Sequence, residues 1–259
     1  MIRVFTAIMI CAAGLFFNRS YALGKFSPTD FSFIDSRIPS KFKITFSCPI
    51  SFGEGVNYGA LLRQSTLFLS LENGIRLQQE KTMSEVRRGE FFPDWFNSVK
   101  SFHGWGDGNK IFTNWVAHPT QGSVSSFIFA NNDDISQKAR FGMNSGYFIA
   151  KKRQFAFAVF YSVVFELGPI SEASIGNVGL HRGLNRGGQS MEDFVLTPVL
   201  GILWSAGEDA VDFYWARNLT HGSIFFKILA SLITPTRSLA NILAFHLPWY
   251  RWSNNLPYD

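Results

Sequence analysis

The chain has 259 residues, of which 46% are hydrophobic, 16% aromatic and 17% charged, and its net charge is +5. A charged fraction well below the roughly 25% of soluble domains leaves little polar surface, so contact with lipid or with an envelope protein is expected. The small charge and the scattered basic residues, which lack an interleaved aromatic stacking pattern, exclude nucleic acid as an expected partner. No stretch has the composition of an inter-domain linker, which favours one folded unit.

The first 22 residues have the pattern of a secretory signal peptide. Arg3 precedes an apolar stretch over 4–17, and Ser20-Tyr21-Ala22 has the small-x-small pattern of a cleavage site. We therefore expect a protein that is secreted across the inner membrane and is periplasmic or outer-membrane-associated. The mature chain would retain Cys48 alone, so no intrachain disulfide is expected.

The segment after the signal peptide predicts an irregular arm followed by a helix. Residues 23–57 are rich in Ser, Pro, Phe and Lys, with one short strand expected over 41–46, where apolar and polar residues alternate. Residues 58–81 have apolar side chains at spacings of three to four and predict an amphipathic helix. From 82 to 109, a proline and closely spaced glycines predict turns rather than regular structure.

Residues 114–131 form the segment around which we expect the rest of the chain to pack. One possibility is that His118 caps this helix, with Pro119 at the first helical position. The alternative is a helix that begins at Asn114 and is kinked by Pro119. In either case Gly122 and Ser126, four residues apart, lie on one face and allow a second helix to approach closely.

The next predicted helix carries the most informative acid. Residues 154–167 are apolar nearly all round, which predicts burial on most sides, after a small-residue connector over 141–150. Glu166 lies at the end of this helix, directly before Gly168-Pro169. A carboxylate in such surroundings is costly unless it is paired or protonated. Residues 174–189 hold five glycines and predict a loop.

A further helix begins with a capping pattern, a serine at position 190 and an acid three residues later. At 100° per residue, Asp193, Thr197, Trp204 and Glu208 fall within a sector of roughly 60° on this helix. The apolar parts of this helix and of the preceding one are too short to predict membrane spans.

The end of the chain completes a mainly α fold. Residues 224–245 contain Pro235 and predict two short helices. We expect a compact helical bundle with kinked, partly membrane-like helices, preceded by an irregular N-terminal arm. The expected parts are a signal peptide, the arm, the helical domain and an irregular aromatic tail, over 1–22, 23–57, 58–246 and 247–259.

Three segments taken in order carry a family resemblance. They are N-W-V-A-H-P-T-Q-G over 114–122, Phe165-Glu166 with Glu172, and S-M-E-D-F-V-L-T-P-V-L-G over 190–201. Together they resemble a family of bacterial secreted proteins that carries only a domain-of-unknown-function label. Its pattern is N-[YW]-[IV]-[AG]-H-P-x-x-G, then an apolar helix with two acids, then S-x-x-D-x-x-x-T-P-x-x-G. The resemblance implies a location in the cell envelope, but no reaction.

The candidate functional residues are one histidine and three acids. His118, Glu166 and Asp193 are the candidate catalytic residues, since a histidine and carboxylates can exchange protons with a substrate. The same residues with Glu172 could instead bind a divalent metal ion. In a third interpretation, His118 and Glu166 satisfy each other as an internal brace, Asp193 caps a helix, and no cofactor is bound.

The main functional hypothesis is a structural or membrane-associated helical domain of the bacterial cell envelope with a buried His/Glu/Asp cluster. One alternative is a metal-dependent or acid/base hydrolase of an envelope lipid or glycan. The motifs H-E-x-x-H and G-x-S-x-G do not occur, so the sequence predicts no particular enzyme class. Another alternative is a binding module whose aromatic segments, 91–96 and 248–252, contact the membrane interface, where Trp and Tyr are favoured.

Overall fold

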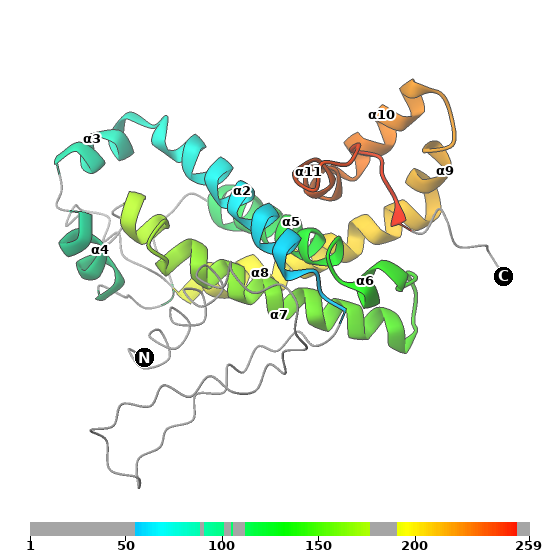
Figure 1. Cartoon of the computed structure of the whole chain (residues 1–259), viewed down its shortest axis with the longest axis horizontal. Coiled ribbons are helices and arrows are strands. Elements are labelled where there is room, and N and C mark those ends of the chain that lie inside the picture. Colours follow the sequence, from blue (N-terminus) through cyan, green and yellow to red (C-terminus); the bar gives the residue numbers. More distant parts are fainter. Residues whose placement is uncertain (1–54, 89–90, 101–104, 106–111, 177–190, 253–259) are drawn as a thin grey trace, which may run out of the picture. The chain divides into compact units, whose positions relative to one another are not determined.

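The structure is a computed structural model, and it describes residues 55–88, 91–100, 105, 112–176 and 191–252 (Figure 1). The predicted signal peptide, the strand over 41–46 and nearly all of the arm lie outside these residues. The helices of the first half are α2 (Tyr58–Leu77), α3 (Glu80–Arg88), α4 (Phe91–Lys100), the π-helical turn η2 (Thr113–Ala117), α5 (His118–Ala130) and α6 (Asp134–Lys138). Those of the second half are α7 (Ser145–Leu167), η3 (Glu172–Gly176), α8 (Met191–Val211), η4 (Asp212–Ala216), α9 (Arg217–Leu219), α10 (Ile224–Ile233) and α11 (Pro235–Leu243). The mainly α helical bundle predicted from the sequence is confirmed.

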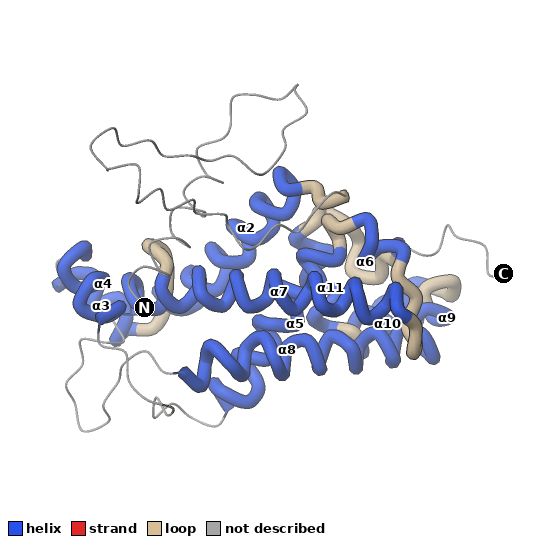
Figure 2. The backbone as a smooth tube through the Cα atoms, turned by 90° about the horizontal axis from the view of Figure 1, so that it is seen from below, coloured by secondary structure: helices blue, strands red, loops and turns tan. Residues whose placement is uncertain are grey.

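Helix α5 is the centre of the bundle, as its small and apolar residues predict. It packs against α8, α7, α11 and α2, and Figure 2 shows it between the long helices α7 and α8. Its core residues Val124, Phe127, Ile128 and Phe129 are buried. A helix covered on every side positions any polar group that it carries inside the protein.

The helix containing Pro119 begins before His118, so the alternative in which His118 is an N-cap is wrong. His118 has helical backbone angles, φ −62° and ψ −46°, and its N–H donates to the carbonyl of Thr113, five residues earlier. The proline has no N–H to donate. The hydroxyl of Thr120 donates to the carbonyl of Val116 at 2.7 Å. The π turn therefore widens the helix where Pro119 interrupts its regular hydrogen bonds.

Helices α5 and α8 touch through their backbones at two glycines. A Cβ added to Gly122 would lie 1.9 Å from the carbonyl oxygen of Thr197, and one added to Gly201 would lie 2.6 Å from Cα of Gly122. The predicted close approach at Gly122 is thus confirmed, with Gly201 as the partner. Ser126 supports it by donating a hydrogen bond to the Gly122 carbonyl at 2.8 Å.

Helix α7 is longer than predicted, because residues 145–150, expected to be a connector, form its first turns. Asn144 caps it by accepting a hydrogen bond from the Tyr147 N–H at 2.9 Å. Within the predicted range 154–167 the helix is largely buried and Phe155 is its exposed residue, whereas the added first turns also expose Phe148 and Ile149. Asn144 provides the cap that makes a helical start favourable for these small residues.

Two helical segments are long and apolar enough to cross a membrane, in contrast to the prediction. They are Ser145–Ile175 and Met191–Leu219, and 50% and 33% of their most apolar windows are buried within the protein. Core helices of soluble proteins reach the same length and composition, so these two properties do not decide between the two environments.

Of the segment expected to form turns over 82–109, residues 82–88 belong to α3 and residues 91–100 form α4, whereas the glycine-rich run over 103–108 lies, apart from Trp105, outside the described residues. Pro93 lies in the first turn of α4, where its missing N–H would have no helical partner anyway. Trp95 anchors this helix by donating to the Leu167 carbonyl at 3.1 Å. The two short helices predicted around Pro235 are confirmed as α10 and α11.

Candidate functional site

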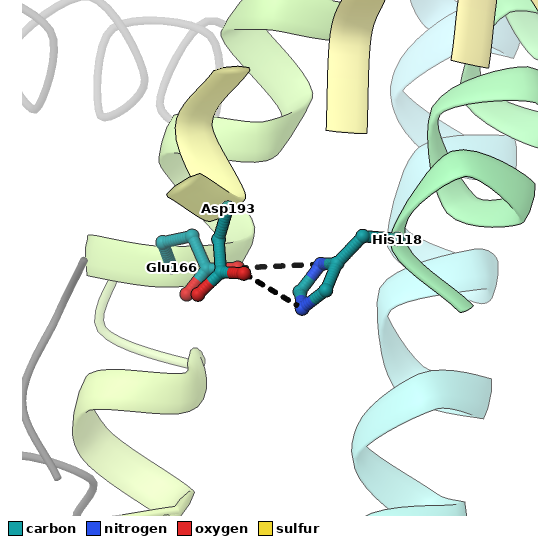
Figure 3. A group of neighbouring side chains, drawn as sticks. All are labelled: His118, Glu166 and Asp193. Atoms are coloured by element: carbon teal, nitrogen blue, oxygen red, sulfur yellow. Dashed lines mark ion pairs between the residues drawn. The ribbon is translucent and has the colours of Figure 1, made fainter. Parts of the chain in front are cut away.

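Three of the predicted residues, His118, Glu166 and Asp193, meet inside the bundle (Figure 3). One ligand atom from each lies within 4.8 Å of the other two. Nε2 of His118 lies 3.3 Å from Oδ1 of Asp193, and Nδ1 lies 3.9 Å from Oε1 of Glu166. We call these three residues the central cluster.

Each residue of the central cluster comes from a different helix. His118 begins α5, Glu166 lies one residue before the end of α7, and Asp193 lies in the first turn of α8. Thr197, one turn after Asp193, places its hydroxyl 3.2 Å from Nδ1 of His118. The contact between Gly122 and Gly201 lies about one turn after His118 on α5 and about two turns after Asp193 on α8, and this close approach of the two helices keeps His118 near Asp193.

The central cluster is almost fully buried, with exposed fractions of 5% for His118, 1% for Glu166 and 6% for Asp193. Oε1 of Glu166 makes no hydrogen bond to any described residue. Burial is the largest cause that raises the pKa of Glu166 well above its usual value, and the charges of Glu172 and Asp193 raise it further. At neutral pH this raised pKa favours the protonated, uncharged form of Glu166.

Helix α2 brings further ionisable groups to the same region. Arg76 forms an ion pair with Glu172 at 2.9 Å, and its positive charge lowers the pKa of Glu166. Glu72 accepts a hydrogen bond from the Tyr161 hydroxyl at 2.7 Å. Burial raises the pKa of Glu72 to about 8 despite the opposing effects of Tyr161 and Arg76. The acidic character of the region thus extends beyond the central cluster.

Glu172 does not belong to the group of converging ligand atoms, although the sequence grouped it with them. It lies in η3, forms the ion pair with Arg76, and acts on Glu166 through its charge. Sequence reasoning missed Glu72 and Arg76 altogether. Both lie in a predicted amphipathic helix, where charged residues are normally solvent-facing. A four-residue spacing between opposite charges was the only available indication.

In the brace interpretation, His118 and Glu166 satisfy each other. Nδ1 of His118 and Oε1 of Glu166 lie 3.9 Å apart, which is within ion-pair distance but beyond a hydrogen bond, and the Thr197 hydroxyl lies nearer to the same ring nitrogen. The closer ionic partner of the imidazole is Asp193. Asp193 therefore contributes to the interior contact with His118.

A second ionic region lies toward the other end of α8. Asp209 binds Lys151 at 2.6 Å, also contacts Arg237, and accepts from the Tyr147 hydroxyl at 2.9 Å. Asp212 pairs with Arg251 and with Arg217.

Glu208 completes this second region by capping α11. It accepts hydrogen bonds from the backbone N–H groups of Thr236 and Arg237, both at 3.0 Å, and from the Trp204 indole at 3.1 Å. The predicted shared face of Asp193, Thr197 and Glu208 is therefore an interior face at both ends of α8, while Trp204 remains partly exposed.

The predicted aromatic surfaces differ from each other. In α4, Phe91, Phe92 and Phe96 are exposed. In the tail, Arg251 is buried against Asp212, so this segment is attached to the bundle.

The central cluster can act through its donor atoms or through its protons. An imidazole and two carboxylates are suitable ligands for a divalent cation, and the same groups can act as acid and base. Comparisons of the chain with protein-family models, with curated proteins and with solved structures give no match. The resemblance of the three sequence segments stays a prediction, and the function is argued from the geometry of the site.

Proposed function

We propose that this chain is a cell-envelope helical domain whose central cluster binds one divalent metal ion. The observation that carries the proposal is the convergence of three buried ligand atoms from separate helices within 4.8 Å. A bound cation would favour the ionised form of Glu166, which burial alone opposes. Oε1 of Glu166 is buried and makes no hydrogen bond to any described residue, which further supports a ligand at this position.

The ligand types favour zinc, manganese or ferrous iron. Donor atoms around a tetrahedral ion with bonds of ~2.1 Å lie roughly 3.4 Å apart. The separation of 3.3 Å between His118 and Asp193 is close to this value, and Glu166 would have to approach by up to about 1.4 Å, from the 4.8 Å bound to 3.4 Å. A proton on Nδ1 of His118, directed at the Thr197 hydroxyl, would leave Nε2 free to bind the ion.

Three protein ligands leave a coordination position for water or a substrate, as in catalytic zinc sites. The ion would lower the pKa of a bound water or polarise an ester oxygen. We therefore place hydrolysis of an envelope lipid or glycan ester as the activity that this centre would support. The centre would be structural if the remaining position is closed.

The test is metal binding by the purified mature chain after chelation. Calorimetric titration with Zn²⁺ or Mn²⁺ and elemental analysis should give about one ion per chain. Glu166→Gln and Asp193→Asn, which keep the side-chain shapes, should each weaken binding at least about tenfold. Glu208→Gln is the matched control, because this buried acid lies on the same helix as Asp193 but caps α11. Equal binding by all four proteins, or no binding by the wild type, would refute the proposal.

A second candidate function, attachment to a lipid surface, is favoured by α10. Ile224, Phe225, Ile228 and Leu232 of this helix are exposed, while Ala230 is buried. The exposed phenylalanines of α4 provide a further apolar surface. Apolar side chains in such number are unusual on a free water-facing helix and fit a lipid interface.

Flotation with phospholipid vesicles would test this attachment. The double variant Phe225→Ser and Leu232→Ser should lower the vesicle-bound fraction several-fold. Met143→Ser serves as the control, since Met143 is nearly fully exposed but lies before α7. Unchanged flotation of the double variant would exclude α10 as the attachment surface. Fractionation of cells, with mass spectrometry of the mature N-terminus, would test export and the expected start near Leu23.

A further inference from the structure

A groove lies between α10 and α11, the last two helices, which contact each other (Figure 1). Its volume is about 330 Å³, within the range of about 300–1,000 Å³ that is typical of small-molecule sites. The large apolar side chains that line it are Ile228 and Leu232 of α10, Leu239 and Ile242 of α11, and Trp249 of the tail. We call this space the C-terminal groove.

The lining residues recur at helical spacing, so the C-terminal groove follows the helices that form it. Ile228 and Leu232 are four residues apart, and Leu239 and Ile242 are three apart, which places each pair on one face of its helix. On α11 the lining extends from Pro235 to Ile242, about 10 Å along the helix axis. A space that follows a helix over this distance fits an extended chain better than a rounded ligand.

The polar side chains in the C-terminal groove are used within the protein. The hydroxyl of Ser231 donates to the carbonyl of Lys227, and that of Ser238 donates to the carbonyl of Ser231, both at 3.0 Å. None of the described lining residues is charged. A polar ligand would lose hydrogen bonds to water when it entered such a space, whereas an alkyl chain has none to lose.

The tail wall of the C-terminal groove is fixed by buried hydrogen bonds. The side-chain amide of Asn241 on α11 donates to the backbone carbonyls directly before and after Trp249, at 2.9 and 3.0 Å. Arg251 donates to the hydroxyl of Thr234, the residue at which α10 and α11 meet, at 3.0 Å. The groove is therefore formed before any ligand arrives, which reduces the entropy that binding would cost.

The charges near the C-terminal groove are positive. Residues 213–252 contain no aspartate or glutamate. Three of the four basic residues in this stretch are arginines that pair with Asp209 or Asp212, whereas Lys227 forms no ion pair with a described residue. Lys227 precedes the lining residue Ser231 by four positions, so it lies on the same face of α10, next to the groove.

We propose that the C-terminal groove receives one acyl chain of an anionic phospholipid, whose headgroup phosphate is bound by Lys227. The inference rests on the attachment of α10 to a lipid surface, the second candidate function proposed above. Ile228 and Leu232 belong both to that exposed surface and to the groove, so the two apolar surfaces are continuous. The ammonium group of a lysine attracts an anionic headgroup.

Two other occupants suit the C-terminal groove less well. An extended peptide would bury backbone N–H and C=O groups against an apolar lining, where they would lack partners. A second copy of the chain that met the groove through the same face would bring together two segments without acids, so their positive charges would repel. A lipid brings an alkyl chain and a negative charge in one molecule.

The experiment uses the mature full chain with vesicles of phosphatidylcholine and phosphatidylglycerol, in which the phosphatidylglycerol carries a photoreactive diazirine at the end of one acyl chain. Light attaches this group to a neighbouring side chain, and mass spectrometry of the peptides locates it. The label should be found on Leu239 and Trp249, which line the groove outside α10. A label confined to exposed side chains of α10 such as Phe225, which is not a lining residue, would overturn the inference.

A variant that fills the C-terminal groove separates groove binding from attachment. Ile242→Trp should lower the labelling of Leu239 several-fold and leave the vesicle-bound fraction in flotation unchanged. Ile242 is 50% exposed, so the fold should tolerate the larger ring, which thermal unfolding checks. Leu203→Trp is the matched control, because it adds the same ring at an exposed residue of α8 outside the groove. Unchanged labelling of Leu239 in Ile242→Trp would contradict the inference.

A second variant tests the headgroup contact. Lys227→Gln should lower the labelling of the groove by phosphatidylglycerol several-fold, whereas Lys138→Gln, at an exposed lysine of α6, should leave it unchanged. Phosphatidylcholine with the same photoreactive chain should label the groove less than phosphatidylglycerol does. Equal labelling by the two lipids, or by the wild type and Lys227→Gln, would overturn the assignment of an anionic phospholipid.

The outcomes distinguish this inference from the attachment on which it rests. If the wild type does not float with the vesicles, the attachment fails and the inference fails with it. If it floats but the label does not reach Leu239 or Trp249, the attachment stands and the inference alone is overturned. A lipid-free dimer that Ile242→Trp converts to a monomer, measured by sedimentation equilibrium, would show that a second copy occupies the groove instead.

Discussion

The two ends of α8 bury acids in opposite ways. Near its start, Asp193 shares an interior space with Glu166 and His118, and Oε1 of Glu166 has no hydrogen-bond partner among the described residues. Toward its end, each oxygen of Asp209 and Asp212 contacts a positively charged side chain. The two ends also differ in pKa, since burial raises that of Glu166, whereas the charges of Arg237, Arg251 and Arg217 hold that of Asp212 below its usual value despite burial.

This difference separates a brace from a binding site. Buried carboxylates whose charge is balanced by arginine and lysine need no further ligand, and they fix how helices meet. A buried carboxyl with a raised pKa, such as Glu166, is instead favoured in its protonated form until a cation arrives. The comparison predicts that equivalent amide substitutions at the two ends differ in their cost, with a large loss of stability at Asp212 and little change at Glu166 in the metal-free chain.

The largest effect is expected from Asp212→Asn. It would leave Arg251, buried on the opposite side of the pair, without its carboxylate, and removal of one partner from a buried ion pair costs about 3–5 kcal/mol. Urea unfolding measures this loss of stability. Asp134→Asn, which replaces an exposed acid, is the control and should change the free energy of unfolding by less than about 0.5 kcal/mol. A small loss for Asp212→Asn would remove the distinction between the two ends.

The acid dependence of the same group sharpens this prediction. Although burial opposes ionisation, Arg237, Arg251 and Arg217 together hold the pKa of Asp212 below its usual value. The stabilisation from Asp212 is therefore complete above the unfolded pKa of about 4, and is lost as the pH falls through the lower folded pKa. The wild type should lose stability in that acidic range, whereas Asp212→Asn should lose less.

The close contact between α5 and α8, which lies midway between the two ends of α8, is the next test. Gly201→Ala places a methyl group 2.6 Å from the backbone of Gly122, so we expect a loss of about 3 kcal/mol and weaker metal binding together. Gly207→Ala is the matched control on the same helix, since nothing lies within 4 Å of its added Cβ. The control should be neutral or more stable by up to about 1 kcal/mol. Retained metal binding in a destabilised Gly201→Ala would show that the approach does not position His118.

The sequence predicted the central cluster better than its surroundings, for physical reasons. His118, Glu166 and Asp193 are polar groups within apolar or capping patterns, so their burial could be expected. Glu72 and Arg76 occur on a helix with ordinary amphipathic spacing, and only the packing of α2 against its neighbours places them inside.

The helix ends were predicted less well than the helix centres. Asn144 caps α7 ten residues before its predicted start, and a side-chain cap depends on local backbone geometry that periodicity does not report. Pro93 was taken as a turn residue, although the first turn of a helix accepts proline. The partners of Asp209 and Asp212 lie on α7, α11 and the tail, and no sequence pattern pairs such distant residues.

Glu72→Gln tests whether the acidic character extends to α2. Burial raises the pKa of Glu72 to about 8. The stability that comes from the protonated side chain is therefore fully present below the pKa of the unfolded chain, and it is lost as the pH rises toward 8. Glu72→Gln has no ionisable group at this position, so it should not lose this stability. Because Glu72 is only part-buried, we expect the free energy of unfolding of Glu72→Gln at pH 8 to exceed that of the metal-free wild type by roughly 1–2 kcal/mol. Parallel unfolding curves at pH 5 and pH 8 measure it, and an equal difference at both values would contradict the raised pKa.

The smallest change in stability is expected from Glu166→Gln in the metal-free chain. The substitution removes a buried carboxylate whose Oε1 makes no hydrogen bond, so little is lost, and we expect a change within about 1 kcal/mol of the wild type, in either direction. Metal should then separate the two proteins. At a metal concentration one hundred times the dissociation constant the wild type gains about 2.7 kcal/mol, whereas the variant, with one ligand replaced, gains much less. A loss as large as that of Asp212→Asn, unchanged by metal, would instead make the central cluster a second brace.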